Sequence, residues 1–283
     1  MNNYSEQKNE IKKLFPEKLN FSVSKGKRKD QQRIYAKTKR HRKNIFIKWA
    51  LNKNDEFYLH ERNAYLSDTI EKFAPKLIQP LSQGNVFSLI DGQTLDEIFS
   101  KQLTIQLAKQ AIKKMAHFHN FSKEVTIDKE IKLTLRKNNL RSELYHAGAM
   151  HGDLDPFNTI LSKKELYFID WEDYRENGLC EIDFVHFIAM LWIITNKNAN
   201  VTLNSKAKKI IEDVFVLNKF KVLFDEYSSI TGTKRSALLR LFPAYCDLSI
   251  SRLKRNKRQW KNFIYVELKK ESKKWLRKNM LEI

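Results

Sequence analysis

The chain is poor in the residues and runs that define several classes of protein. It has two cysteines, Cys180 and Cys246, which lie far apart and have no Cys-x-x-Cys spacing or neighbouring histidine pattern. They predict neither a disulfide framework nor a zinc site, and they are typical of a reducing compartment. The most apolar segment, residues 184–195, is too short to span a bilayer and predicts a buried helix.

The first residues give no sign of export. Residues 1–15, MNNYSEQKNEIKKLF, are polar and lack the apolar core of a signal peptide. With 283 residues, 42% of them hydrophobic, the chain can bury a sizeable core as one large domain or as two lobes. We therefore expect a folded cytoplasmic protein.

The formal net charge of +20 is concentrated at the two ends of the chain. Residues 1–60 hold 16 Lys and Arg against 6 Asp and Glu, and residues 252–283 hold 12 against 3, so the long middle contributes only +1. This skew has two interpretations. It indicates an anionic partner, such as nucleotide phosphates, nucleic acid or an acidic membrane surface, or it only keeps exposed faces solvated.

Hydrophobic patterning divides the chain into a β-rich part and a helical part. Apolar residues alternate in the early segments, as in strands, and recur every three or four residues in the later ones, as in helices. We expect strands at 19–27, 32–39, 43–51, 74–83 and 85–92, a helix at 56–73, and further helices at 94–103 and 104–121. The expected fold is α+β, with a small β-rich lobe at 1–89, a connector near 88–92 and a larger, mainly helical lobe at 90–283.

The candidate catalytic and metal-binding residues are concentrated in one segment. Residues 151–173, HGDLDPFNTILSKKELYFIDWED, interrupt the helical part and hold six carboxylates against two lysines. Clustered carboxylates repel one another, so a cation or a proton is expected among them. Phosphoryl transfer needs an acceptor for the substrate proton and metal ions on the phosphates. Asp153 fits the first role, and Asn158 and Asp170 offer the hard oxygen ligands that magnesium prefers.

A cation that grips the nucleotide phosphates is expected earlier in the chain. Lys48 ends the apolar strand NIFIKWA, and a helix carrying Glu61 follows it. A strand lysine paired with a glutamate of the next helix is the arrangement that kinases use. Glu56 is the alternative partner, because the register of that helix is uncertain by a few residues.

These motifs resemble those of the aminoglycoside phosphotransferase and choline kinase families, small-molecule relatives of the protein kinases. The resemblance is carried by HGDLDPFN, FIDWED, the helix AIKKMAHFHNF and the turn LIDGQTL, and it spans roughly residues 20–190. It implies a two-lobed, protein-kinase-like fold that binds ATP and Mg²⁺. It also implies Asp153 as catalytic base, Asn158 and Asp170 as magnesium ligands, and Lys48 with Glu61 at the nucleotide. Asp183 would steady the catalytic loop.

Two features depart from the family pattern. The loop SKGKRKDQQR contains a single glycine, Gly26, where the family has a glycine-rich fingerprint, so Gly26 is a weak candidate for nucleotide binding. Asp155 stands at a variable position and is assigned no role beyond substrate contact. Glu172 and Asp173 have two interpretations, further ligands of the metal site or solvated acids at a strand end, and we favour the second. His117 and His119 are interpreted as packed or surface residues of a helix rather than metal ligands.

The basic tail, residues 251–279, also has two interpretations. Trp260, Ile264, Leu268 and Trp275 recur at roughly helical intervals between lysines and arginines. Such a helix could lie on an anionic membrane surface, which would place the protein at the inner membrane face. We favour the alternative, a closing helix that packs on the large lobe.

The function expected from the resemblance is phosphate transfer from ATP to a hydroxyl of a non-protein substrate. Acids are sparse after residue 190, so a cationic acceptor is disfavoured, and a sugar, a phosphorylated metabolite or a surface glycan or glycolipid precursor fits better. Kinases of the choline, ethanolamine or aminoglycoside type are the alternative. A nucleotide-binding pseudokinase is less well supported, because each catalytic position holds a competent residue. A nucleic-acid-binding module has no recognised motif here.

Overall fold

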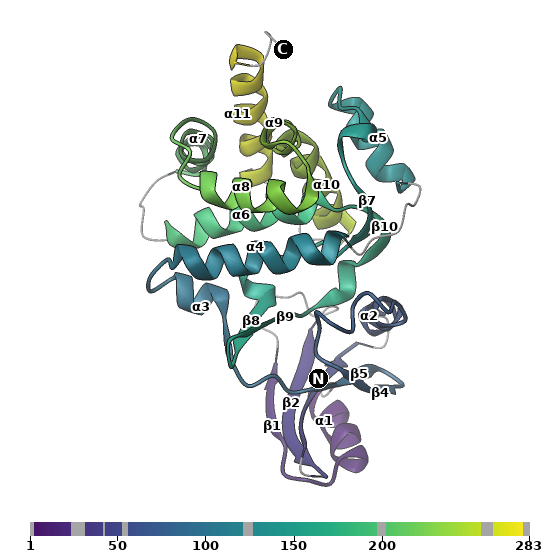
Figure 1. Cartoon of the computed structure of the whole chain (residues 1–283). Helices are drawn as coiled ribbons and strands as arrows, with labels where there is room; N and C mark the ends of the chain where they lie inside the picture. Colours follow the sequence, from purple (N-terminus) through teal and green to yellow (C-terminus); the bar gives the residue numbers. More distant parts are fainter. Residues whose placement is uncertain are drawn as a thin grey trace. The chain divides into compact units, whose positions relative to one another are not determined.

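The computed structural model describes residues 3–23, 32–41, 43–52, 56–120, 127–196, 202–255 and 263–279 (Figure 1). It divides into two compact units, Met1–Gln93 with Ile160–Tyr174 and Thr94–Thr159 with Arg175–Ile283. Residues 160–174, which the sequence analysis counts in the second lobe, thus belong to the first unit. There the backbone N–H of Phe168 donates to the carbonyl oxygen of Phe73 at 2.7 Å.

The first unit is built on a five-stranded antiparallel sheet. Its strands are β1 (Asn20–Val23), β2 (Arg33–Arg40), β3 (Lys43–Ala50), β4 (Leu77–Leu81) and β5 (Gly84–Ser88), in the order β1-β2-β3-β5-β4. All five coincide with segments expected to be strands, except that β2 ends one residue late and β5 begins one residue early. Gly84 is required at that point, because a Cβ there would lie 2.3 Å from the carbonyl oxygen of Lys48 on β3.

Side chains along β3 alternate between a face that joins the hydrophobic core and a face that carries Lys48. Ile45, Ile47 and Trp49 are buried in one hydrophobic cluster, and Lys48 points to the opposite side, as the two-residue period of a strand requires. Helix α1 (Asn3–Leu14) packs on the core face through Ile11. The sequence analysis does not predict α1, because its polar residues outnumber its apolar ones.

The helix expected at 56–73 is shorter than predicted. Helix α2 is Phe57–Tyr65, and the chain continues to residue 73 in turns. Ser67 and Asp68 explain the early end, because their side chains compete for backbone hydrogen bonds and favour turns. Ile70 and Phe73 are nevertheless buried, so the turns still contribute to the core.

A hairpin follows the HGD motif. Strands β8 (Thr159–Ser162) and β9 (Glu165–Phe168) form a three-stranded sheet with β6 (Gln93–Thr94), in the order β6-β8-β9. The one-turn helix η4 (Trp171–Asp173) comes next, immediately after Asp170. Asp170 has a φ of 66°, which few residues other than glycine adopt. Backbone strain of this kind is concentrated at functional sites.

The second unit is mainly helical. Its helices are α3 (Leu95–Phe99), α4 (Ile105–Asn120), α5 (Lys129–Lys137), α6 (Glu181–Thr195), α7 (Leu203–Ile211), α8 (Lys221–Thr231), α9 (Arg235–Arg240), α10 (Phe242–Arg255) and α11 (Phe263–Asn279). The short helices η2 (Ser142–Leu144), η3 (Pro156–Asn158) and η5 (Glu212–Val216) and the antiparallel pair β7 (Ala147–Met150) and β10 (Arg175–Leu179) complete it. The small β-rich unit and the larger helical unit confirm the predicted fold class.

Helix α6 forms the centre of this unit (Figure 1). It is mostly apolar and almost entirely buried, and its polar residues Glu181, Asp183 and His186 are buried with hydrogen-bond or ion-pair partners. Phe184 on α6 stacks on Tyr227 of α8, with ring centroids 4.4 Å apart. The buried helix expected at residues 184–195 is therefore confirmed, and it begins one turn earlier.

The basic tail packs on its own unit. Helix α11 contacts α7 and α10, with Leu268 buried and the Trp275 ring 4.9 Å from that of Phe215. Lys269 donates to Asp247 of α10 at 2.5 Å. The favoured interpretation of the tail as a packing helix agrees with these contacts, whereas Trp260 lies outside the described residues.

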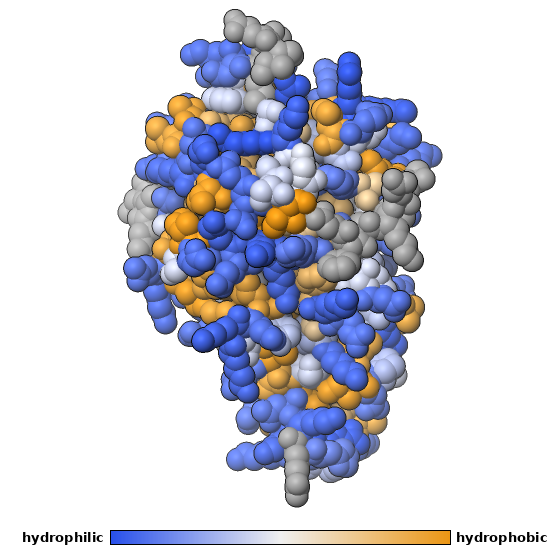
Figure 2. All heavy atoms as spheres, in the orientation of Figure 1, coloured by the Kyte–Doolittle hydropathy of each residue, from blue (hydrophilic) through white to orange (hydrophobic). Residues whose placement is uncertain are grey.

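Hydrophilic side chains spread over the visible face in Figure 2, with hydrophobic ones in small groups between them. Among the described residues, every helix is too short or too polar to cross a membrane.

Substitution of Ile11 tests whether α1 belongs to the core. Ile11→Ala should lower the free energy of unfolding by about 2–5 kcal/mol, because it removes a fully buried side chain. Leu14→Ala, on the same helix but 47% exposed, should change it by less than about 0.5 kcal/mol. Urea unfolding followed by circular dichroism measures both. Equal effects of the two substitutions would contradict the packing of α1.

Candidate active site

Asp183 fixes the backbone of the loop that carries the HGD motif, residues 151–158, called the HGD loop below. This fully buried carboxylate on α6 accepts hydrogen bonds from the backbone N–H of His151 at 2.7 Å and of Gly152 at 2.9 Å. The ring of His119 lies 3.3 Å away through Nε2, and its Nδ1 is 2.7 Å from the Tyr227 hydroxyl. Asp183 thus makes the contacts expected of a residue that steadies this loop, and His119 is a buried member of the same network.

The loop then folds on itself. Asp155 is buried and caps η3, where its carboxylate accepts from the N–H groups of Phe157 at 2.8 Å and Asn158 at 3.0 Å. The Asn158 side-chain amide donates to the carbonyl oxygen of Asp153 at 2.8 Å. This bond uses the Nδ2 of Asn158 and leaves its Oδ1 as a ligand for a hard cation. Asp155 therefore has a structural role that the sequence analysis does not assign.

Two cationic side chains that the sequence analysis misses meet the Asp153 carboxylate. Arg252 on α10 contacts the carboxylate, and its Nη1 also donates to the carbonyl oxygen of Gly152 at 2.7 Å. The His186 Nε2 on α6 lies 3.1 Å from Asp153 Oδ1 and 3.6 Å from Asp155 Oδ2. The other ring nitrogen of His186 is 2.8 Å from the Tyr245 hydroxyl.

Arg252, His186 and the two carboxylates together determine the protonation states of Asp153 and His186. Burial raises the pKa of Asp153, but the charges of Arg252 and His186 outweigh it and hold that pKa below its ordinary value. Burial lowers the pKa of His186, but Asp153 and Asp155 outweigh it and raise that pKa to about 9. Near neutral pH, an ionised Asp153 therefore stands beside a cationic imidazole and a guanidinium.

Asp153, Asp155 and His186 could also be considered as metal ligands, since one atom from each lies within 4.8 Å of the others. An imidazole must be neutral to bind a metal, whereas the carboxylates favour protonated His186. Arg252 already neutralises part of the negative charge. The charges of this cluster are therefore balanced by its own side chains.

In the first unit, Lys48 lies between two carboxylates. Its Nζ donates to Glu61 Oε1 at 3.1 Å and also contacts the carboxylate of Asp170. Burial opposes the charge of Lys48, but Asp170 and Glu61 outweigh it and hold the pKa of Lys48 above its ordinary value. Asn85 donates to the second oxygen of Glu61 at 3.3 Å. Glu61 is thus the partner of Lys48, and Glu56 instead precedes the first residue of α2.

A second ion pair lies beside this group. Arg33, a buried residue of β2, pairs with Glu172 on η4 and stacks 3.8 Å above the Phe57 ring. Glu172 was expected to be a solvated acid, and this expectation is wrong, because its carboxylate balances a guanidinium that is only 4% exposed. Gly26 lies outside the described residues. The structure therefore groups Lys48, Glu61 and Asp170 in one unit, and Asp153 and Asn158 in the other.

Known small-molecule kinases resemble this chain in sequence and in fold. A relative in Mycoplasma capricolum subsp. capricolum, named Protein LicA homolog, is 26% identical over 191 residues, or 62% of this chain and 75% of the relative. Choline kinase LicA from Streptococcus pneumoniae superposes with a TM-score of 0.57 at 13% identity, covering 97% of this chain and 98% of that one. A structure of LicA in complex with AMP gives 0.53 at 15% identity, with the same coverage.

Macrolide 2'-phosphotransferase MphH from Brachybacterium faecium superposes with a TM-score of 0.51 at 11% identity, covering 90% of this chain and 96% of that one. The chain has the kinase-like fold of the choline kinase and aminoglycoside phosphotransferase group. The predicted resemblance and the predicted two-lobed fold are both confirmed. The RIO domain family also matches residues 102–177 of this kinase-like chain, a range that contains the HGD loop.

Neutralising Asp183 should release the HGD loop. In Asp183→Asn the amide can no longer offer two charged acceptor oxygens to the N–H groups of His151 and Gly152. Hydrogen bonds to a charged acceptor contribute about 1.5–3 kcal/mol, so these two amides should exchange about ten- to a hundredfold faster. Hydrogen exchange measured by NMR checks this. The control is Asp225→Asn, whose carboxylate is 51% exposed, and unchanged exchange in Asp183→Asn would refute the role.

Proposed function

We propose that this chain is an ATP- and magnesium-dependent phosphotransferase whose acceptor is a hydroxyl of a non-protein molecule. The buried ion pair of Lys48 with Glu61 carries the proposal. Burying a lysine is costly unless its charge is compensated, and in kinases this pair holds the lysine that binds the nucleotide phosphates. The kinase-like fold, and the AMP complex of LicA, support a nucleotide as the ligand.

Each site residue has a proposed role. Lys48 would bind the nucleotide phosphates, with Glu61 orienting its side chain. Asp170 and Asn158 would ligate magnesium, which neutralises charge on the phosphates when it is bound. The Asp153 carboxylate would accept the proton of the acceptor hydroxyl, and Arg252 and His186 keep that carboxylate ionised.

For the acceptor, we propose a neutral or anionic alcohol, such as a sugar or a phosphorylated metabolite. The guanidinium of Arg252 and the imidazole of His186 both stand at the Asp153 carboxylate, where the hydroxyl would have to bind. They balance the carboxylates that would otherwise attract a cation, which disfavours a cationic acceptor. Choline is the second candidate, favoured by the similarity over nearly the whole chain to the choline kinase LicA.

The activity is tested with purified protein, terminally labelled ATP and magnesium. Choline is supplied in one reaction and an extract of the source cells in another. Asp153→Asn should lower label transfer by about two to four decades, the usual contribution of a general base, with nucleotide affinity nearly unchanged. Asp170→Ala and Lys48→Ala should instead weaken Mg-ATP binding, measured by calorimetry.

Asp225→Asn serves as the control and should transfer label at the wild-type rate, because this half-exposed carboxylate pairs with Lys221 one turn away on the same helix. Label on choline would favour the choline-type acceptor over the neutral or anionic one. Nucleotide binding without any label transfer would indicate a pseudokinase, and wild-type transfer by Asp153→Asn would overturn the assignment of the base.

A further inference from the structure

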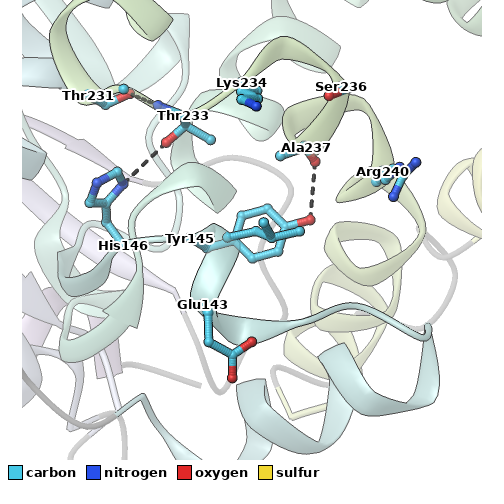
Figure 3. Close-up of a pocket in the computed structure, with 11 residues that line it drawn as sticks. Glu143, Tyr145, His146, Thr231, Thr233, Lys234, Ser236, Ala237 and Arg240 are labelled. Atoms are coloured by element: carbon cyan, nitrogen blue, oxygen red, sulfur yellow. Dashed lines mark hydrogen bonds between the residues drawn. The ribbon is translucent and has the colours of Figure 1, made fainter. Parts of the chain in front are cut away.

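The second unit contains a cavity of about 610 Å³ that the proposed site does not use (Figure 3). It lies at the start of β7, where His146 precedes the strand, whereas the HGD loop follows its end. The walls come from η2 and from the segment that joins α8 to α9. This volume is within the range of small-molecule sites.

Two residues that line the cavity, His146 and Thr233, contact a fully buried carboxylate, Glu181 on α6. It accepts from the backbone N–H of His146 at 3.1 and 3.2 Å, from His146 Nδ1 at 2.7 Å and from the Thr233 hydroxyl at 2.8 Å. Both oxygens of Glu181 are thus occupied. A carboxylate only accepts hydrogen bonds, so Nδ1 of His146 carries its hydrogen.

The second ring nitrogen of His146 is then available to a ligand. The side chain of His146 is 48% exposed, and within the described residues its Nε2 has no hydrogen-bond partner. The hydrogen bond to Glu181 raises the pKa of His146 despite partial burial, so the ring stays protonated to a higher pH than an isolated histidine. In that state Nε2 is a donor.

Three more polar side chains of the cavity wall lack partners in the part of the chain that the structure describes. They are Lys234, Ser236 and Arg240, from α9 and the residue before it. Lysine and arginine can only donate hydrogen bonds. Glu143 also lines the cavity, but its carboxylate accepts from Ser142 at 3.2 Å and points away from Lys234 and Arg240 in Figure 3.

We propose that this cavity binds a small molecule through a phosphate group. The free groups on its wall can all donate hydrogen bonds, two of them are the cationic side chains of Lys234 and Arg240, and a phosphate supplies acceptor oxygens and negative charge. A lone amine or a neutral sugar would leave these donors without charged acceptors. None of the cavity residues belongs to the proposed phosphotransfer site, so the two proposals stand or fall separately.

Inorganic pyrophosphate is the probe for this site. Titration calorimetry of the full chain without magnesium should detect binding, and the double variant Lys234→Gln/Arg240→Gln should raise the Kd about tenfold or more, because it removes two charge-assisted donors. The control, Lys208→Gln/Arg277→Gln, removes the same charges from exposed positions on α7 and α11 and should bind within about twofold of the wild type.

Binding of pyrophosphate at the proposed nucleotide site is a separate outcome, which Lys48→Ala distinguishes. The cavity proposal holds if Lys48→Ala retains a site that the Lys234/Arg240 variant loses. It is overturned if the wild type does not bind pyrophosphate at millimolar concentration, or if the cavity variant, folded by circular dichroism, binds as the wild type does.

Discussion

The buried carboxylate of Asp183 is the constraint on which the second unit is organised. An ionised group that is fully removed from water is strongly destabilising unless hydrogen bonds surround it. Asp183 meets this demand with two backbone N–H groups of the HGD loop, His151 and Gly152, and with the ring of His119. The loop cannot leave its position without exposing that charge to an apolar interior, so the helix that carries Asp183 dictates where Asp153 lies.

The basic tail affects the proposed site because one of its residues, Arg252, balances the charge of the Asp153 carboxylate. Arg252 at the end of α10 reaches Asp153, and α10 is held in turn by α11. Lys269 of α11 pairs with Asp247 of α10, and the Tyr265 ring lies 5.8 Å from that of Tyr245. Packing of the tail therefore determines the position of a guanidinium at the proposed base.

The sequence predicts the parts of the site that are local in the chain. Asp153 and Asn158 share one loop, and Asp170 follows after a short hairpin, so the motif from which their roles are predicted lies in one segment. Lys48 and Glu61 follow the strand-then-helix order of kinases, but only the observed register of α2 selects Glu61 over Glu56. The predictions for Asp153, Asn158 and Asp170 needed no knowledge of long-range packing, whereas the choice of Glu61 needed the structure.

What the sequence could not predict depends on contacts across the chain. Arg252 lies 99 residues from Asp153 and has no motif around it, and Glu172 gives no sign of its distant partner Arg33. Helix α1 has few apolar residues, and only its packing on the sheet shows that Ile11 belongs to the core.

The first turn of α6 also makes contacts that depend on distant parts of the chain. Glu181 and Asp183 are two residues apart, so they face different neighbours. Glu181 bonds His146 before β7, and Asp183 bonds His151 after it. One helical turn thus holds both ends of the strand that leads to Asp153, with the cavity at one end and the HGD loop at the other.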